Sequence, residues 1–261
     1  AKIEPERFYY HCDQLGMLVW QDMVNGGSAY KHWFVTYLAT LMNWNHISFS
    51  DDEKHAGLLS RLHPEGKDEF RREITETIAF LYNHPSIVVW VPFNEGWGQF
   101  DALAACEQIR TLDSSRLVDH ASGWFDQKGG DILSLHYYFL KLKFKPESKR
   151  AAALTEFGGY SLSIPGHSCC KKVYGYKKFN STGTLTYGYI DLIRQTILPA
   201  VKKGIGATVY TQLSDIEEET NGIYTYDREI CKIDPDTLRK WNRALKEAGE
   251  CKTYADHTTD H

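Results

Sequence analysis

The pattern of apolar and polar positions predicts alternating strands and helices along most of the chain. Ile87–Val91 is an unbroken apolar run, which is typical of a parallel strand that is covered on both faces. Apolar residues at helical spacing predict a helix over Asp68–Asn83, with Asp68 as its N-cap. The apolar face of this helix is expected to consist of Phe70, Ile74, Ile78 and Leu81.

The same alternation recurs before and after this unit. Further strands are expected at Met17–Trp20, Leu117–His120, Asp131–Leu135, Ala151–Thr155 and Ile205–Thr211. Further helices are expected at Ala1–Leu15, Asp101–Leu112 and Asp236–Ala248, and one that contains Ile190, Ile193, Ile197 and Val201, with a kink at Pro199. Strands that alternate with helices at this spacing predict an α/β fold with a parallel sheet.

Polar or aromatic residues follow each of the six predicted strands. The strands end near Gln21, Asn94, His120, Tyr137, Glu156 and Gln212. Because the carboxyl ends of parallel strands lie on the same side of a sheet, we expect these residues to form one face. Barrel enzymes keep their active sites on that face. The aromatic-rich segment Tyr30–Ser50 is expected to pack over it as an insertion.

Two glutamates among these strand-end residues form the strongest candidate for catalysis. Glu95 and Glu156 are 61 residues apart and have two predicted strands between them, a separation that would let them face each other across a barrel. Enzymes that cleave glycosidic bonds typically use a pair of carboxylates. Either glutamate alone would be an ordinary loop ion pair or helix cap. Glycine within two residues and flanking aromatic residues at both positions favour the catalytic interpretation.

Composition narrows the class of protein. A length of 261 residues suits one α/β barrel, which typically takes about 250. The formal net charge of 30 − 34 = −4 gives no general attraction to nucleic acid, and the basic stretch Lys141–Arg150 is interpreted as a solvated loop. No run of 18 apolar residues exists, so no membrane span is expected. The 7 Trp, 16 Tyr and 12 Phe suit both a core and a sugar-binding surface.

The six cysteines are scattered and form no Cys-x-x-Cys pair, so we expect neither a zinc site nor another metal or cofactor. Cys169 and Cys170 are interpreted as reduced thiols. Reduced cysteines favour a cytoplasmic location.

Several motifs in a fixed order resemble the catalytic TIM barrel of glycoside hydrolase family 2, the family of β-galactosidase, β-glucuronidase and β-mannosidase. The resemblance covers nearly everything from Pro5 to Lys246. It rests on Asp13–Asp22 (DQLGMLVWQD), His84–Gly96 (HPSIVVWVPFNEG), Asp131–Tyr138 (DILSLHYY) and Thr155–Gly158 (TEFG).

The resemblance implies that Glu95 is the general acid/base and Glu156 the nucleophile of a retaining exo-β-glycosidase, with carboxyl groups about 5–5.5 Å apart. Asn94 would hold the sugar 2-hydroxyl. Either Tyr137 or Tyr138 would donate a hydrogen bond to Glu156. The remaining candidates for sugar contacts, each with packing as the alternative role, are Asp22, Trp124, His136 and Gln212.

The chain also departs from the family pattern. We expect residues 1–250 to form a partial barrel with strands 3–8 of the (β/α)8 fold, strands 1 and 2 being absent, and residues 251–261 to form a polar tail. We also expect the family's β-sandwich domains, which lie further upstream and would be partners, to be missing from this sequence. Open sheet edges are normally avoided. We therefore expect weak or no activity from these 261 residues alone, or self-association into a homo-oligomer.

The sugar is less well defined by the sequence. The loop Asp215–Asp227 resembles galactosidase-like members most, so β-galactosidase-like activity on a carbohydrate substrate is favoured. The alternatives are β-glucuronidase or β-mannosidase specificity, or a non-catalytic sugar-binding remnant. A phosphate-binding barrel is disfavoured because no Gly-rich phosphate loop follows the last strands.

Overall fold

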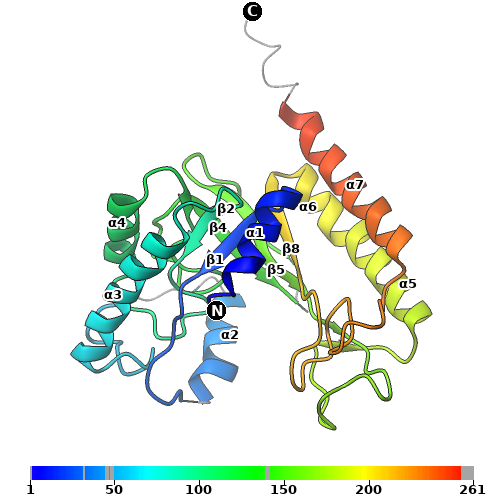
Figure 1. Ribbon diagram of the computed structural model, residues 1–261, viewed down its shortest axis with the longest axis horizontal. Coiled ribbons are helices and arrows are strands. Elements are labelled where there is room, and N and C mark those ends of the chain that lie inside the picture. Colours follow the sequence, from blue (N-terminus) through cyan, green and yellow to red (C-terminus); the bar gives the residue numbers. More distant parts are fainter. Residues whose placement is uncertain (1, 32, 45–46, 48–49, 139–141, 254–261) are drawn as a thin grey trace, which may run out of the picture. The chain divides into compact units, whose positions relative to one another are not determined.

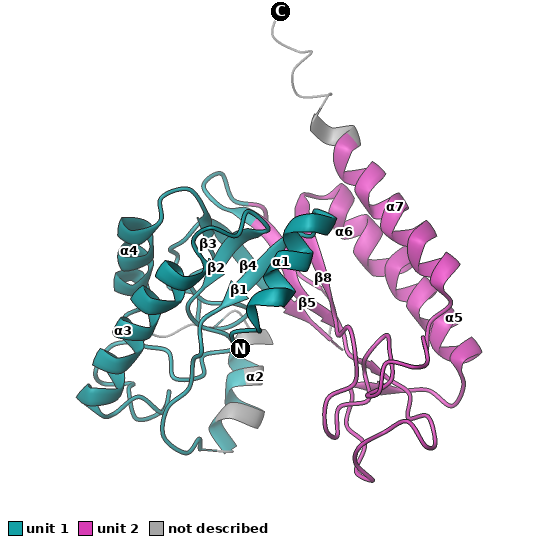
Figure 2. Ribbon diagram, viewed as in Figure 1, with its two compact units in different colours: residues 1–135, 147–151 teal, residues 136–146, 152–261 magenta. Residues whose placement is uncertain are grey.

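A computed structural model describes residues 2–31, 33–44, 47, 50–138 and 142–253 (Figure 1). The chain divides into two compact units. Unit 1 consists of residues 1–135 and 147–151, and unit 2 consists of residues 136–146 and 152–261 (Figure 2).

Unit 1 is built on a parallel three-stranded sheet in the order β1-β2-β3. Its strands are β1 (Val19–Asp22), β2 (Ile87–Val91) and β3 (Leu117–Val118), and its helices are α1 (Glu6–Leu15), the π-helical turn η1 (Phe34–Leu38), α2 (Ala39–Trp44), α3 (Pro64–Leu81) and α4 (Ala102–Leu112). Helices α3 and α4 lie side by side (Figure 1).

The core of unit 1 confirms the predicted apolar face of α3. Phe70, Ile74, Ile78 and Leu81 are each at most 2% exposed, and the Phe70 ring stacks on Phe93 with centroids 4.9 Å apart. The predicted N-cap was wrong. The helix begins four residues earlier, at Pro64, because a proline fits the first helical turn, where its missing N–H costs no hydrogen bond.

The buried carboxylate of Asp113 ties the central strand to the loop after α4. Its Oδ2 accepts hydrogen bonds from Trp90 Nε1 at 2.9 Å and Arg116 Nη1 at 2.6 Å, while Oδ1 accepts from the Ser115 amide and hydroxyl. Burial by itself would raise the pKa of Asp113, but the hydrogen bonds from Ser115, Arg116 and Trp90 outweigh it and lower the pKa to about 2.

Replacing this carboxylate is expected to destabilise unit 1 in a pH-dependent way. Asp113→Asn should lower the free energy of unfolding by about 2–4 kcal/mol near neutral pH, because Arg116 loses its charged partner. The folded-state pKa lies below the unfolded one, so the carboxylate stabilises above the unfolded value of about 3.9, and its contribution is lost as the pH falls through about 2. The difference in the free energy of unfolding between wild type and variant should therefore become smaller in acid.

Urea denaturation measured from neutral pH downward tests this expectation. Asp68→Asn is the matched control, because Asp68 pairs with Arg71 on the exposed face of α3 and should contribute less than about 1 kcal/mol. A pH-independent difference for Asp113→Asn would contradict the electrostatic origin of the effect.

Unit 2 contains the other half of the strands. Strand β4 (Ile132–Tyr137) begins in unit 1, and its last two residues belong to unit 2. Strand β5 (Ala151–Gly158) pairs in parallel with β8 (Ile205–Thr211), and β6 (Tyr160–Ser161) pairs with β7 (Lys177–Lys178). The helices of unit 2 are α5 (Thr182–Leu192), the π-helical turn η2 (Ile193–Ile197), α6 (Leu198–Lys202) and α7 (Pro235–Thr253).

The predicted strands and helices of unit 2 are present, with local differences. A kink was expected at Pro199, and the structure has the π turn η2, which ends two residues before the proline, where Pro199 has no N–H to donate. Helix α7 continues to Thr253, so residues 251–253 of the expected polar tail are helical. The rest of that tail lies outside the described residues.

The closed architecture expected of a TIM barrel is not present in the described part of the chain. Its strands form two three-stranded sheets and one two-stranded sheet rather than a ring. Strand β8 pairs on one side only, with β5, so its other edge has no strand partner among the residues that the structure describes. No helix within those residues has the length and apolar character needed to cross a membrane.

Candidate active site

Glu95 lies in a tight loop directly after β2. The parallel pairing between β2 and β3 continues into the segments that follow them. Ser122 N donates to Phe93 O at 2.8 Å, and Glu95 N donates to Ser122 O at 2.9 Å. The backbone then enters the left-handed region three times, with φ of 51° at Glu95, 72° at Gly96 and 66° at Gly98. A left-handed glutamate is uncommon, and such conformations cluster at functional sites.

Aromatic rings surround this loop. A Cβ on Gly96 would lie 2.3 Å from the Phe125 ring, so only glycine fits this left-handed position. Trp97 is 41% exposed, and its ring packs on Tyr30 with centroids 4.6 Å apart. An exposed indole beside a carboxylate suits the apolar face of a sugar. Trp97 was not among the predicted site residues, although the segment FNEGWG that contains it carried the signal.

The other predicted site residues of unit 1 lie at or beyond the carboxyl ends of its strands. Asp22 is the last residue of β1 and lies opposite Val91 of β2, and Asn94 is bridged to Ser122. Trp124 is half-buried and packs against a cluster that contains Phe125, with ring centroids 6.4 Å apart. Packing is therefore part of the role of Trp124.

Glu156 lies near the carboxyl end of β5 in unit 2. The Tyr138 hydroxyl donates a hydrogen bond to its Oε2, and Thr211 Oγ1 lies 3.3 Å from the same hydroxyl. The buried His136 ring places Nδ1 3.6 Å from Glu156 Oε2. Of the two tyrosines that the sequence left open, the structure shows Tyr138 in contact with Glu156.

The position of Tyr138 follows from local geometry. Adjacent residues of an extended segment point to opposite faces, so His136 and Tyr138 share a face that Tyr137 does not. The Tyr138 ring stacks on Tyr176 with centroids 4.1 Å apart and 15° between the planes. A Cβ at Gly159, where φ is 62°, would lie 2.4 Å from the Tyr176 ring, which explains the second glycine of Glu156–Tyr160 (EFGGY). Tyr176 was not identified from the sequence.

Gln212 directly follows β8. Its Nε2 donates to Asn221 Oδ1 at 2.7 Å and to Glu219 Oε2 at 3.2 Å, and its backbone N donates to Asn221 O. These bonds fix the orientation of the amide. The loop that supplies them is itself held by Lys232, whose fully buried Nζ donates to Asp215 Oδ1 at 2.7 Å.

One group of metal-ligating side chains in unit 2 lies on exposed loops. His167 Nδ1 is 2.7 Å from Asp227 Oδ2 and 3.8 Å from Glu229 Oε2. A hydrogen bond from the Thr225 hydroxyl is the main cause that lowers the pKa of Asp227 to about 2. Hydrogen bonding and ion pairing account for this cluster, so we assign it no metal.

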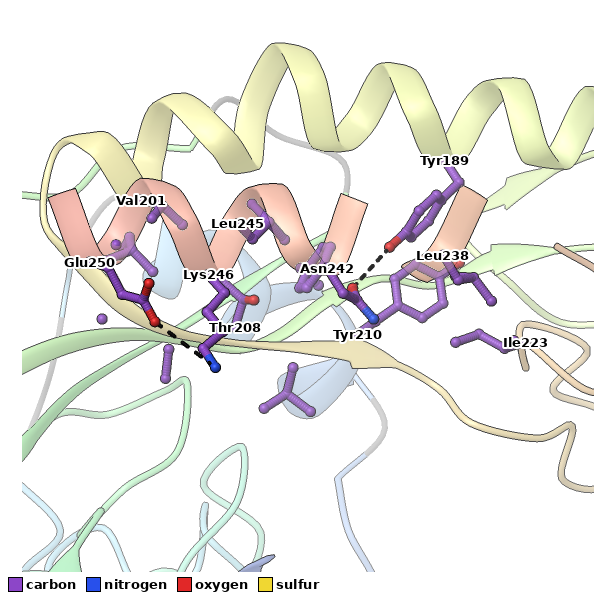
Figure 3. A pocket seen from close by; sticks show the side chains of 16 residues that line it. Tyr189, Val201, Thr208, Tyr210, Ile223, Leu238, Asn242, Leu245, Lys246 and Glu250 are labelled. Carbon is purple, nitrogen blue, oxygen red and sulfur yellow. Dashed lines mark hydrogen bonds and ion pairs between the residues drawn. The ribbon is translucent and has the colours of Figure 1, made fainter. Parts of the chain in front are cut away.

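A cavity in unit 2 is separate from these residues. It has a volume of about 720 Å³ and lies between β8 and α7, with Tyr189, Leu238 and Leu245 among the residues that line it (Figure 3). Tyr189 donates to Asn242 Oδ1 at 3.5 Å across its side. Neither Glu156 nor Gln212 lines it. We therefore interpret it as a gap in the helix-to-sheet packing rather than as the catalytic pocket.

Comparison with known proteins identifies the family to which the chain belongs. Residues 4–198 match the model of the "Glycosyl hydrolases family 2, TIM barrel domain". This match covers well over half of the chain, and the chain therefore belongs to glycosyl hydrolase family 2.

Two curated relatives show where the similarity lies. A β-galactosidase of Leuconostoc mesenteroides is 26% identical over 263 residues, which is 95% of this chain and 22% of that protein. A β-mannosidase B of Thermothelomyces thermophilus is 32% identical over 94 residues, which is 36% of this chain and 8% of that protein. The chain thus spans less than a quarter of the length of either relative.

Solved structures share the fold at low sequence identity. A β-D-glucuronidase of Dictyoglomus thermophilum has a TM-score of 0.58 at 14% identity over 93% of this chain and 43% of its own. A β-galacturonidase of Eisenbergiella tayi has a TM-score of 0.55 at 18% identity over 92% of this chain and 44% of its own. These likenesses support the fold and not a particular substrate.

Proposed function

We propose that this chain carries the catalytic residues of a retaining exo-β-glycosidase, with Glu156 as nucleophile and Glu95 as general acid/base. The observation that carries the proposal is the setting of Glu156. The Tyr138 hydroxyl donates to one carboxylate oxygen, Oε2, and His136 Nδ1 lies 3.6 Å from it, whereas no hydrogen bond to Oε1 occurs within the described residues. One fixed oxygen and one available oxygen suit a carboxylate that attacks carbon.

The reaction would proceed by double displacement. Glu156 attacks the anomeric carbon while Glu95 donates its proton to the departing glycosidic oxygen, so one C–O bond breaks as the ester bond to Glu156 forms. Glu95, now a carboxylate, then removes a proton from water. The water oxygen attacks the same carbon and releases Glu156. Two inversions give net retention, and the expected carboxyl separation of about 5–5.5 Å stays a prediction.

The remaining strand-end residues are proposed to contact the sugar. Asn94 would donate to the 2-hydroxyl, where hydrogen bonds strengthen in the transition state. The side chains proposed to line the rest of the sugar site are Asp22, Trp124, His136 and Gln212. Tyr137 is left out because it lies on the opposite face from His136 and Tyr138. Trp97 joins them because its ring is exposed and it follows Glu95 by two residues.

A β-galactoside is the favoured substrate. The L. mesenteroides β-galactosidase matches 95% of this chain, whereas the β-mannosidase match is confined to 94 residues and the β-glucuronidase likeness is structural. Specificity for β-mannosides or β-glucuronides is the alternative.

A panel of nitrophenyl glycosides tests both activity and specificity in the natural protein at its full length. We expect hydrolysis of the β-galactoside to exceed that of the β-mannoside, the β-glucuronide and the α-galactoside by at least about tenfold, since one sugar contact contributes about 1–3 kcal/mol. NMR of the first product should show the β-anomer. First release of the α-anomer would contradict the double displacement.

The open sheet edge of β8 supports a second candidate function, a sugar-binding protein without turnover. Calorimetry would distinguish the two. Saturable galactose binding with no hydrolysis of any member of the panel would favour the binding protein and exclude the proposed glycosidase.

A further inference from the structure

The loop that presents Glu95 needs external support. Left-handed backbone at a non-glycine residue costs about 1–3 kcal/mol and persists only where the surroundings impose it. Within the loop, Trp97 N donates to Asn94 O at 3.1 Å and Gln99 N donates to Gly96 O at 3.3 Å. Two side chains from distant parts of unit 1 supply further hydrogen bonds.

Asn25 is the first of these side chains. Its Nδ2 donates to Trp97 O at 2.9 Å and to Asn94 O at 3.3 Å, so one amide group connects the residues on both sides of Glu95. The two backbone segments are also in direct contact, since a Cβ on Gly98 would lie 2.0 Å from Gly26 O. Asn25 therefore fixes the width of the loop.

Arg61 is the second. Its Nε donates to Gly98 O at 3.0 Å and its Nη1 donates to Gly66 O at 3.2 Å. The guanidinium carbon lies 5.2 Å from the Phe70 ring centroid and 5.4 Å from that of Phe100. Only 8% of the residue is exposed. A buried, planar group held by aromatic faces and a second carbonyl is a rigid donor to the end of the loop.

We infer that Asn25 and Arg61 are positioning residues for Glu95, acting through the carbonyl groups of Asn94, Trp97 and Gly98. This inference rests on the proposed function, because it concerns proton donation by Glu95. Neither side chain is placed in contact with the sugar. Their common effect is to hold the left-handed Glu95 backbone so that the carboxyl group keeps one orientation.

Positioning can be separated from general stability by the choice of leaving group. Misplacement of a catalytic group by about 1 Å can cost about 10²-fold in rate. A poor leaving group such as phenol needs the proton from Glu95, whereas dinitrophenol departs without it. A displaced Glu95 therefore slows hydrolysis of the phenyl glycoside but not that of the dinitrophenyl glycoside. Partial unfolding lowers the rates of both substrates by the same factor, so their ratio within one variant is unaffected.

Asn25→Asp tests the first contact without a change of volume, because a carboxylate oxygen replaces the donating NH2 group and faces two carbonyl oxygens. In the natural protein at its full length, we expect kcat/KM for the phenyl glycoside to fall about 10–10²-fold and that for the dinitrophenyl glycoside to fall less than about threefold. Asn83→Asp, the same exchange at an exposed turn, should change neither value.

Arg61→Lys tests the second contact and keeps the charge. Lysine lacks the fork that reaches Gly98 O and Gly66 O together, so the same selective loss of phenyl glycoside turnover is expected. Arg72→Lys, at an exposed position of α3, is its control. Equal losses with both leaving groups in the Asn25 and Arg61 variants would overturn the inference and leave a structural role.

Glu95→Gln in the same assay separates this inference from the proposed function. A selective loss in Glu95→Gln without one in the Asn25 and Arg61 variants rejects only the positioning role. An absence of leaving-group selectivity in Glu95→Gln itself rejects the acid/base assignment, and the positioning role with it.

Discussion

Glu156→Gln is expected to abolish turnover of nitrophenyl β-glycosides, with kcat reduced by about 10⁴-fold or more, as is usual when a covalent nucleophile is removed. Glutamine keeps the size of the side chain and can still accept the hydrogen bond from Tyr138, but its neutral amide oxygen does not form the ester to the anomeric carbon. Steady-state hydrolysis by the natural protein at its full length measures the loss.

Two controls make this result specific. Glu247→Gln carries the same exchange on the exposed side of α7 and should retain wild-type activity. A mechanism-based inactivator, a 2-fluoro glycoside with a good leaving group, should label the wild-type peptide that contains Glu156 and leave the Glu156→Gln protein unlabelled. Labelling of another carboxylate, or activity of the variant within about tenfold of wild type, would contradict the nucleophile assignment.

The strand-end chemistry could be predicted because it depends on two local properties of the sequence. An apolar run such as Ile87–Val91 marks a strand covered on both faces, and the polar residues directly after it mark its carboxyl end. Glu95 and Glu156 were found by this rule, and the structure places both at strand ends. The choice between Tyr137 and Tyr138 required knowing to which face each side chain points at the end of β4. A shift of one residue exchanges the two faces.

The supporting contacts could not be predicted because they join residues that are remote in the chain. Asn25 lies outside every predicted strand and helix, and its bonds to Asn94 and Trp97 cross about 70 positions. Arg61 lies in a segment for which no periodic pattern defined an element. A partial barrel of six strands was expected, whereas the described strands are divided among separate sheets, because long-range strand pairing is not encoded by local sequence.

Glu95→Gln is expected to reduce kcat/KM by about 10²–10⁴-fold for a phenyl glycoside, the usual contribution of a general acid. The loss should shrink to less than about tenfold for a dinitrophenyl glycoside in the first step, because that leaving group departs without a proton. Rates measured over a series of phenols should therefore depend weakly on phenol acidity in the wild type and steeply in the variant.

The second half of the reaction gives an independent check on the same residue. With a dinitrophenyl glycoside, Glu95→Gln should accumulate the glycosyl ester on Glu156, because no base removes the proton from water, and a burst of dinitrophenol should precede a slow steady state. A small anion such as azide needs no base and should accelerate that steady state. The two variants would then differ in their kinetics, since Glu95→Gln shows a burst and Glu156→Gln shows none with any leaving group. If both variants instead lost activity equally with every substrate and neither gave a burst, the division of roles between the two carboxylates would be wrong.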